Sequence, residues 1–369
     1  MERDEMQKKV DLRSCLVCDL ENMAVRAGEK KFRGRQVFQW VHRHFSEKIQ
    51  DMKNVNKDFL SHLEKTAYLR PLELLAKESA KEDSTEKFLF GLRDGQAVET
   101  VLMHYRYGAS ICVSTQVGCR MGCAFCASTI GGLIRNLSAG EMAGQVIDVH
   151  RLAPLEERAY SIVVMGSGEP LENYHETIKF IRIINDPMGL GIGWRRITVS
   201  TCGLVPAIYR LAEEQIPINL AVSLHASNDR MRDRLMPINQ KYPLEELLAA
   251  CRSFIAKTGR RITFEYVMIK GLNDSREAAF ELAEKLRGLL CHVNLIPVNP
   301  IKEKPYQRPS LKQIDEFSSI LSDRGLEVTI RRELGQDVEA ACGQLRSRFA
   351  DRARMGADRI EGKAGEKDD

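Results

Sequence analysis

Short β-rich runs alternate with helical stretches from residue 109 to residue 332 of this chain. The β-rich runs read SICVST, YSIVVMG, RITVST, INLAVSL, ITFEYVMI, HVNLIP and EVTIRR. Such an alternation predicts an α/β fold, in which crossover helices join the strands of a parallel sheet, wound as a barrel or left open. Two of the helices are expected to begin at capping boxes, Ser138 with Glu141 and Ser310 with Gln313.

The preceding 108 residues show two other patterns. Residues 1–70 carry apolar side chains at three- and four-residue spacing, which predicts a small helical domain. Residues 71–108 contain EKFLFGL and AVETVLMHY around the turn RDGQ, which predicts a β-rich extension. We therefore expect the α/β core to occupy residues 109–348. The charged tail, residues 349–369, is expected to be disordered.

Composition is that of an ordinary soluble globular protein, with 43% hydrophobic and 29% charged residues. No apolar run is long enough to span a bilayer, and the first residues lack the apolar stretch of a secretory signal. We expect a cytoplasmic monomer with no membrane partner. Ten cysteines in such a chain indicate a metal site or catalysis rather than a disulfide framework.

A basic cluster lies between residues 26 and 44, where six basic side chains face only Glu29. Its members are Arg26, Lys30, Lys31, Arg33, Arg35 and Arg43. Such a cluster suits a polyanion such as RNA, and a solvated helix face is the alternative. Phe38, Trp40 and Trp194 offer rings for base stacking, although burial in the core competes with this, above all for Trp40.

Five motifs follow predicted strands. GCRMGCAFC follows the first strand of the core, GSGEP the second, STCG the third, SLH the fourth and VNP the sixth. The carboxyl ends of barrel strands lie on one face, which carries the active site of such folds. We therefore expect these segments to meet.

The first motif places Cys119, Cys123 and Cys126 close together. Soft thiolates favour an iron–sulfur cluster or zinc. Zinc would need a fourth ligand, such as a distant histidine, and zinc motifs usually repeat a C-x2-C pair that is missing here. The pattern C-x3-C-x2-C, with an aromatic residue before the last cysteine, resembles the signature of radical S-adenosylmethionine (SAM) enzymes. In those enzymes three cysteines hold a [4Fe–4S] cluster whose fourth iron binds SAM.

The second motif offers Gly168 and Glu169. Glycine lets a backbone approach a ligand closely, and a carboxylate can accept hydrogen bonds from an ammonium group. A tight turn between a strand and a helix is the alternative. Taken alone, this motif does not decide between the two.

The motifs together resemble one family, the RlmN/Cfr group of radical SAM RNA methyltransferases, from about residue 20 to residue 348. The resemblance rests on the segments CVSTQVGC, MGSGEPLEN, WRRITVSTCG, VSLHASND, LMPIN, VNLIPVNP and AACGQL. The resemblance implies a partial (β/α)6 barrel of the TIM type, a [4Fe–4S] cluster, and SAM as both methyl donor and radical source. It implies SAM contacts from Gly168, Glu169, Ser200, Ser223, Leu224, His225 and Asn299. Without the family, His225 would be interpreted as a structural histidine.

The resemblance also implies a covalent relay. Cys342 would take a methyl group from one SAM, and a radical derived from a second SAM would remove a hydrogen atom from that group. The methylene carbon would then add to adenine, Glu99 would remove the ring proton, and Cys112 would release the RNA by forming a disulfide with Cys342. Outside the family, Cys112 and Cys342 would be buried core thiols and Glu99 an exposed carboxylate.

Two branches of the family act on different carbons. One methylates adenine C2 in 23S rRNA and in the tRNA anticodon loop, and GEPLEN, WRRITVSTCG and NLIPVNP look like that branch. The departure is Ser167, where methionine is expected. A Cfr-type C8 methyltransferase is one alternative, and a non-catalytic RNA-binding iron–sulfur redox sensor is another. An enzyme of this kind would take electrons from flavodoxin or ferredoxin.

The remaining cysteines are predicted to be structural. Cys15 and Cys18 lie on a helical pattern with no second pair following, so both are expected in the core. Cys202, Cys251 and Cys291 lie in or beside predicted core elements, and Cys202 is the nearest of them to the expected active face.

Overall fold

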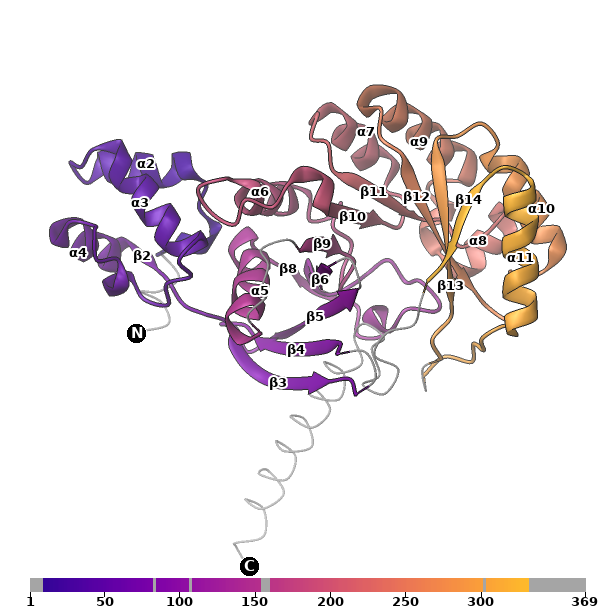
Figure 1. Ribbon diagram of the computed structural model, residues 1–369, viewed down its shortest axis with the longest axis horizontal. Helices are drawn as coiled ribbons and strands as arrows, with labels where there is room; N and C mark the ends of the chain where they lie inside the picture. The colour runs from indigo at the N-terminus through magenta and orange to yellow at the C-terminus, as the bar shows by residue number, and fades with distance from the viewer. Residues whose placement is uncertain (1–8, 82–83, 106–107, 154–159, 301–302, 332–369) are drawn as a thin grey trace, which may run out of the picture.

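A computed structural model of the protein describes residues 9–81, 84–105, 108–153, 160–300 and 303–331. Its centre is a ten-stranded sheet with the strand order β14-β13-β12-β11-β10-β9-β6-β5-β4-β3, flanked on one side by a small helical lobe (Figure 1). Cys342 and the tail 349–369 lie outside the described residues. In the described part of the chain, every helix is too short or too polar to traverse a bilayer.

The predicted α/β core is confirmed, because neighbouring strands from β6 to β14 are all parallel. The strands are β6 (Gly108–Cys112), β9 (Ser161–Val164), β10 (Ile197–Thr201), β11 (Asn219–Ser223), β12 (Ile262–Met268), β13 (Cys291–Pro297) and β14 (Glu327–Ile330). The helices between them are α5 (Ala139–Leu152), α6 (Tyr174–Asn185), α7 (Val205–Glu213), α8 (Asp229–Leu235), α9 (Leu244–Thr258), α10 (Arg276–Leu286) and α11 (Leu311–Asp323). Both predicted capping boxes are present, at the starts of α5 and α11.

The pleat of the parallel strands separates two environments. On β12, Phe264 and Tyr266 belong to the large apolar core shared with the helices, and on β13 so do Val293 and Leu295. Residues that alternate with them face the other way. Glu265 is one of these, and it lines a cavity rather than the helix-covered core. The inner face of the curved sheet therefore carries Glu265 beside apolar side chains such as Val267 and Ile296.

Three antiparallel strands extend the sheet beyond β6. They are β5 (Ala97–Tyr105), β4 (Glu86–Gly91) and β3 (Glu73–Ser79), which matches the β character predicted for this segment. A separate hairpin of β7 (Gln116–Gly118) and β8 (Leu133–Asn136) follows β6. The three clustered cysteines lie in the loop between β7 and β8.

The predicted N-terminal helices are also present, as α2 (Val17–Arg26), α3 (Lys31–His42) and α4 (Lys57–Thr66). They enclose a second apolar core, and a short ladder between β1 (Val10–Asp11) and β2 (Ala67–Tyr68) closes the lobe. Cys15 is buried in this core, as predicted, and Cys251 and Cys291 are buried in the main core. The prediction for Cys18 is wrong, because its position on α2 turns the side chain to the solvent.

A buried ion pair joins the helical lobe to the barrel. Arg13 donates from both terminal guanidinium nitrogens to Asp148 of α5, over 2.7 and 3.0 Å, and both side chains are 2% exposed. Asp148 also accepts a hydrogen bond from the backbone N–H of Leu72, at 2.8 Å. Gly140 lets the two parts approach, since a Cβ there would lie 2.2 Å from the Asp11 carboxylate. The lobe is therefore held to the barrel at a fixed position.

Replacing Asp148 with alanine should strongly destabilise the protein, because it leaves the Arg13 guanidinium buried without its counter-charge. Removal of one partner of a buried pair costs about 3–5 kcal/mol. Equilibrium unfolding in urea would measure the loss of stability. Glu21→Ala is the control, since the partner of Glu21, Arg35, is half-exposed, and the loss should be about 0–1 kcal/mol. Equal losses in both variants would contradict this account of the junction.

Candidate active site

One cavity of about 310 Å³ lies at the carboxyl ends of the parallel strands. It is lined by residues from the loops that follow β7, β9, β10, β11 and β13. Nine of the residues singled out in the sequence lie on its wall: Cys119, Cys123, Cys126, Gly168, Glu169, Ser200, Ser223, His225 and Asn299. The structure thus brings together side chains that are up to 180 positions apart in the chain.

The cysteine loop is anchored by backbone hydrogen bonds. The N–H of Cys119 donates to the carbonyl of Gly132, and the N–H of Ala124 donates to the carbonyl of Leu235 at the end of α8. The hydroxyl of Thr129 donates to the carbonyl of Cys126 at 2.9 Å. These bonds fix the backbone on which the three thiols are mounted.

The donor set fits an iron–sulfur cluster. Among the described residues no three histidine, cysteine or acidic side chains converge on one point as ligands of a single metal ion would. A four-iron cluster binds each thiolate at a separate iron. Burial raises the pKa of the Cys119 thiol to about 12, and the neighbouring Cys126 and Glu169 oppose a further negative charge. Three neighbouring thiolates, of which Cys119 and Cys123 are buried, need the positive charge that iron provides.

The loop after β9 needs glycine at one position. Gly168 has a φ of +109°, and a Cβ there would lie 2.6 Å from the Cβ of Gln116. The backbone N–H of Glu169 donates to the side-chain oxygen of Gln116 at 2.8 Å. Gln116, which the sequence analysis did not single out, therefore fixes this loop against β7.

The Glu169 carboxylate is buried at the cavity wall. Its two oxygens accept hydrogen bonds from the N–H groups of Leu171, at 3.0 Å, and Cys202, at 2.7 Å. Burial raises the pKa of Glu169, and these two N–H groups act in the opposite direction. The backbone bond from Cys202, which is itself buried and lines the cavity, ties the ends of β9 and β10 together.

His225 adopts a left-handed backbone conformation with φ of +58°, which is rare for a residue other than glycine. The N–H of Val267 donates to its Nδ1 at 3.0 Å, which assigns the ring proton to Nε2. Burial and the charge of Arg232 lower the pKa of His225 to about 3, so the ring is neutral. It lies edge-on to Phe125, with ring centroids 4.8 Å apart. Phe125 is the aromatic residue of the cysteine motif, which explains why an aromatic ring belongs at that position.

Arg232 on α8 is a structural residue that the sequence analysis missed. It is fully buried and donates to the carbonyls of Cys202, Ser223 and Leu224 at 2.7 to 3.2 Å. It thereby joins the ends of β10 and β11 below the cavity. Arg232 lies between the motifs VSLHASND and LMPIN, in the short stretch 230–234 that neither motif covers.

Three predicted site residues lie beside the described cavity wall rather than on it. Leu224 is buried, and its backbone N–H donates to the carbonyl of Glu265. Cys112, at the end of β6, belongs to a small apolar cluster with Val101 and Met103, and Met165, which lines the cavity, packs against this cluster.

Glu99 is not the exposed carboxylate that its sequence context alone favoured. It is 6% exposed on β5 and lies 3.3 Å from the Nζ of Lys87, which is fully buried. Val101, two residues further along β5, pairs with Cys112 across β5 and β6. Glu99 and Cys112 therefore lie on the same face of the sheet.

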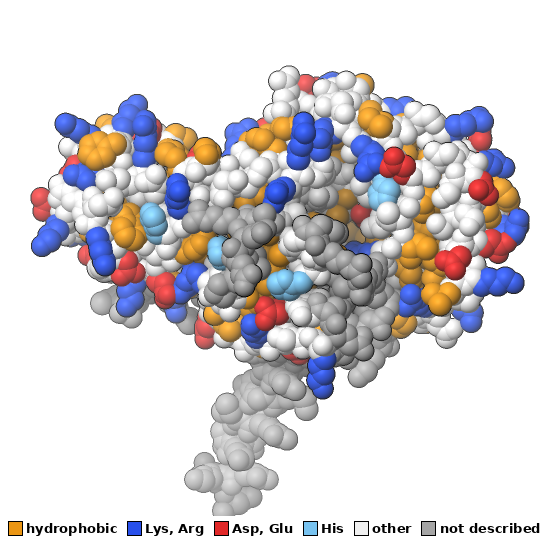
Figure 2. Space-filling view, viewed as in Figure 1, with side chains coloured by type: hydrophobic (Ala, Val, Ile, Leu, Met, Phe, Trp, Pro, Cys, Tyr) orange, Lys and Arg blue, Asp and Glu red, His pale blue; other side chains and the backbone are white. Residues whose placement is uncertain are grey.

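The basic cluster is largely solvent-accessible. Arg26, Lys30, Lys31 and Arg43 are exposed, whereas Arg35 pairs with Glu21. On the face drawn in Figure 2, Lys and Arg side chains are spread over the helical lobe with acidic groups between them. Phe38 is fully buried, so the base-stacking interpretation fails for this ring. Trp40 and Trp194 are half-buried.

Comparison with known proteins first identifies the class. Residues 113–283 match the radical SAM superfamily, in agreement with the parallel barrel and the three cysteines. Residues 10–69 match the ribosomal RNA large subunit methyltransferase N-terminal domain. The radical SAM class implies a [4Fe–4S] cluster and SAM, and the donor set described above fits both.

Individual relatives then identify the family. The chain is 50% identical over 343 residues to a probable dual-specificity RNA methyltransferase RlmN of Alkaliphilus metalliredigens, covering 93% of this chain and 97% of that protein. A protein of the same name from Pelotomaculum thermopropionicum is also 50% identical, with 93% of each chain covered. The crystal structure of a radical SAM methyltransferase from Sphaerobacter thermophilus superposes with a TM-score of 0.86 at 46% identity, covering 91% of this chain and 98% of that one. This chain belongs to the RlmN family of radical SAM methyltransferases.

Replacing Gly168 with alanine should damage the cavity, because the backbone conformation excludes a side chain and Gln116 fills the space. The strained backbone alone costs about 1–3 kcal/mol. We expect a lower unfolding midpoint and a weaker affinity for SAM in equilibrium dialysis. Gly193→Ala is the matched control, since no atom lies within 4 Å of a Cβ there. An unchanged affinity in Gly168→Ala would show that this loop does not contact SAM.

Proposed function

We propose that the protein methylates C2 of adenosine in 23S rRNA and in tRNA, through a methyl-cysteine intermediate and a transient disulfide, with two SAM molecules per turnover. The observation that carries the proposal is the cavity that gathers the three cysteines and six of the seven SAM-contacting positions of the family, all except Leu224, at the ends of parallel strands. Relatives 50% identical over most of the chain carry the name of dual-specificity RNA methyltransferases.

The cofactor arrangement follows from the wall of the cavity. Cys119, Cys123 and Cys126 would hold the [4Fe–4S] cluster, with one iron left for SAM. Glu169 would accept hydrogen bonds from the SAM ammonium group, and Ser200, Ser223, His225 and Asn299 would contact the rest of the molecule. Bound together, the cluster and SAM supply a radical able to remove a hydrogen atom from a methyl group. Apolar neighbours such as Phe125 and Val267 would limit the access of water.

The protein's own thiols divide the methyl transfer into feasible steps. Cys342 would accept the methyl group by displacement at sulfur and would then carry the carbon that joins the base. Glu99 would take the proton lost from adenine. The Cys112 thiolate would finally attack the Cys342 sulfur and form a disulfide. The bond between that sulfur and the carbon on adenine would break, and the carbon would keep the electron pair and take up a proton, which completes the methyl group and releases the RNA. The position of Cys112 supports this role, because the apolar cluster that contains it packs against Met165, a residue of the cavity wall.

RNA recognition is assigned to the helical lobe, and several observations support this assignment. The lobe matches an rRNA methyltransferase domain, carries exposed basic side chains, and is joined to the barrel by the Arg13–Asp148 ion pair. The target base would have to leave its stack to reach the cavity. A monomer acting in the cytoplasm, with flavodoxin or ferredoxin as the electron source, completes the proposal.

The proposal is tested by incubating the anaerobically reconstituted protein with SAM, dithionite and unmodified 23S rRNA or tRNA. Mass spectrometry of the digested nucleosides should show 2-methyladenosine from both RNAs. Finding 8-methyladenosine instead would identify a C8 enzyme of the Cfr type. If no nucleoside is methylated and no 5′-deoxyadenosine forms, a redox sensor would be the better description.

Cys112→Ala should accumulate an RNA–protein adduct, because the thiol that forms the releasing disulfide is missing. Denaturing gels of reactions with labelled RNA would show the slower band. The double variant Cys112→Ala/Cys342→Ala is the control, since it lacks the sulfur that would carry the adduct, and it should show none. Normal release of methylated RNA by Cys112→Ala would exclude the resolving role.

A further inference from the structure

A second carboxylate, Glu265, faces the cavity in addition to Glu169. It lies in the middle of β12, is 6% exposed and lines the cavity wall. In the strand register it is the neighbour of Ser223, one of the residues proposed to contact SAM. The sequence analysis did not single it out, because ITFEYVMI was interpreted only as a strand.

A chain of hydrogen bonds holds Glu265 as an acceptor. The Thr329 hydroxyl lies 3.0 Å from the His292 Nε2 and donates to the Asn294 side-chain oxygen at 3.1 Å. That bond turns the Asn294 amide nitrogen toward Glu265, where it donates to Oε2 at 2.8 Å. The three strands β12, β13 and β14 thus fix the carboxylate from one side.

The two carboxylates of the cavity differ in the number of hydrogen bonds that they already accept from the protein. Each oxygen of Glu169 already accepts one backbone N–H, which leaves one lone pair on each oxygen for the SAM ammonium group. Among the described residues, Oε1 of Glu265 accepts no hydrogen bond, while burial raises the pKa of this carboxyl group and the charge of Arg331 opposes that shift. A carboxylate on the wall of the cavity, with an oxygen that can still accept a hydrogen bond, suits a ligand that brings O–H or N–H groups.

We propose that Glu265 is a recognition residue that accepts hydrogen bonds from an adenosine. This inference rests on the proposed function, which brings two adenosines to the cavity: the adenosyl group of SAM and the target nucleoside of the RNA. Both offer the required donors, as ribose hydroxyls and as the adenine amino group. Burial raises the pKa of Glu265, and the charge of Arg331, on the same wall, acts against that rise.

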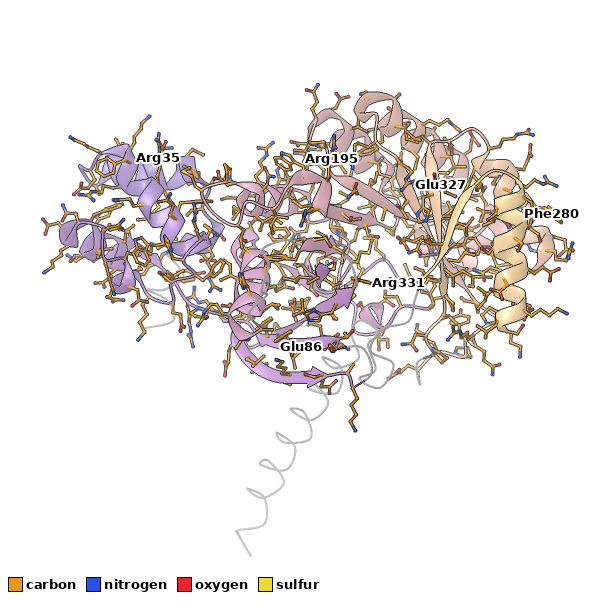
Figure 3. All side chains as sticks on the ribbon, in the orientation of Figure 1. Arg35, Glu86, Arg195, Phe280, Glu327 and Arg331 are labelled. Atoms are coloured by element: carbon orange, nitrogen blue, oxygen red, sulfur yellow. The ribbon has the colours of Figure 1, made fainter. Side chains whose placement is uncertain are left out.

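Glu265→Gln is the decisive variant. Since Asn294 needs an acceptor, the amide oxygen of the new side chain would stay on Asn294, and its NH2 group would face the ligand. The NH2 group of the glutamine would then face the O–H or N–H groups of the ligand, and no hydrogen bond could form between two donors. Loss of a hydrogen bond to a charged group should weaken binding of the recognised adenosine by roughly 10- to 100-fold. Glu327→Gln is the matched control, because Glu327 lies at the other end of β14 from Arg331, is largely exposed and pairs with Arg261 (Figure 3).

Two measurements distinguish the sources of the adenosine. In the first, equilibrium dialysis gives the affinity of the cluster-loaded protein for SAM without RNA. In the second, single-turnover methylation compares RNA that carries adenosine at the target position with RNA that carries purine riboside, which lacks the amino group. A weaker SAM affinity in Glu265→Gln would identify the adenosyl group of SAM as the ligand of Glu265. Loss of the preference for adenosine in the RNA, with SAM affinity unchanged, would identify the target base as the ligand.

The inference is overturned if both measurements stay within about twofold of the wild type in Glu265→Gln. Iron and sulfide content and the thermal unfolding midpoint establish that the variant is folded and loaded. If it does not fold, Glu265→Asp replaces it, since it keeps the charge and shortens the reach by one methylene. The SAM measurement needs no turnover. A chain that methylates no RNA but needs Glu265 to bind SAM would refute the proposed function and leave this inference intact.

Discussion

The alternation of side chains along seven parallel strands is the constraint on which the rest of this structure depends. Because successive residues of a strand point to opposite faces, one set packs with the helices and the other faces the interior of the curved sheet. The apolar set, such as Phe264 and Leu295, supplies the stability. The interior set is thereby free to be polar, and the cavity is built from it and from the loops at the strand ends.

The cavity combines rigid backbone with buried charge. Arg232 joins the ends of β10 and β11, Gln116 fixes the loop that carries Glu169, and Asn294 orients Glu265. Each of these contacts satisfies a buried polar group that would otherwise be costly. A site that must hold a cluster and a nucleoside in defined positions benefits from such support, because small displacements of reacting groups have large effects on rate.

Buried polar contacts also join the helical lobe to the barrel. The Arg13–Asp148 pair and the close approach at Gly140 hold the exposed basic residues of the lobe at a fixed position relative to the barrel. This arrangement suits an enzyme that binds RNA with the lobe and modifies one of its bases in the cavity of the barrel. The antiparallel pairing of β5 with β6 places Glu99 on the same face of the sheet as Cys112.

The sequence by itself determined the order of strands and helices, both capping boxes and the motif at each strand end, because these depend on local periodicity and spacing. The cysteine spacing and the ordered motifs also pointed to the family. Only the tertiary structure decided that Cys18 is exposed, that Glu99 is buried against Lys87, and that Arg232 and Glu265 belong to the site. Those outcomes depend on partners from other strands and helices. Arg232 donates a hydrogen bond to the carbonyl of Cys202, 30 positions away, and Glu265 accepts one from Asn294, 29 positions away. The local pattern of a segment does not identify partners at such a distance along the chain.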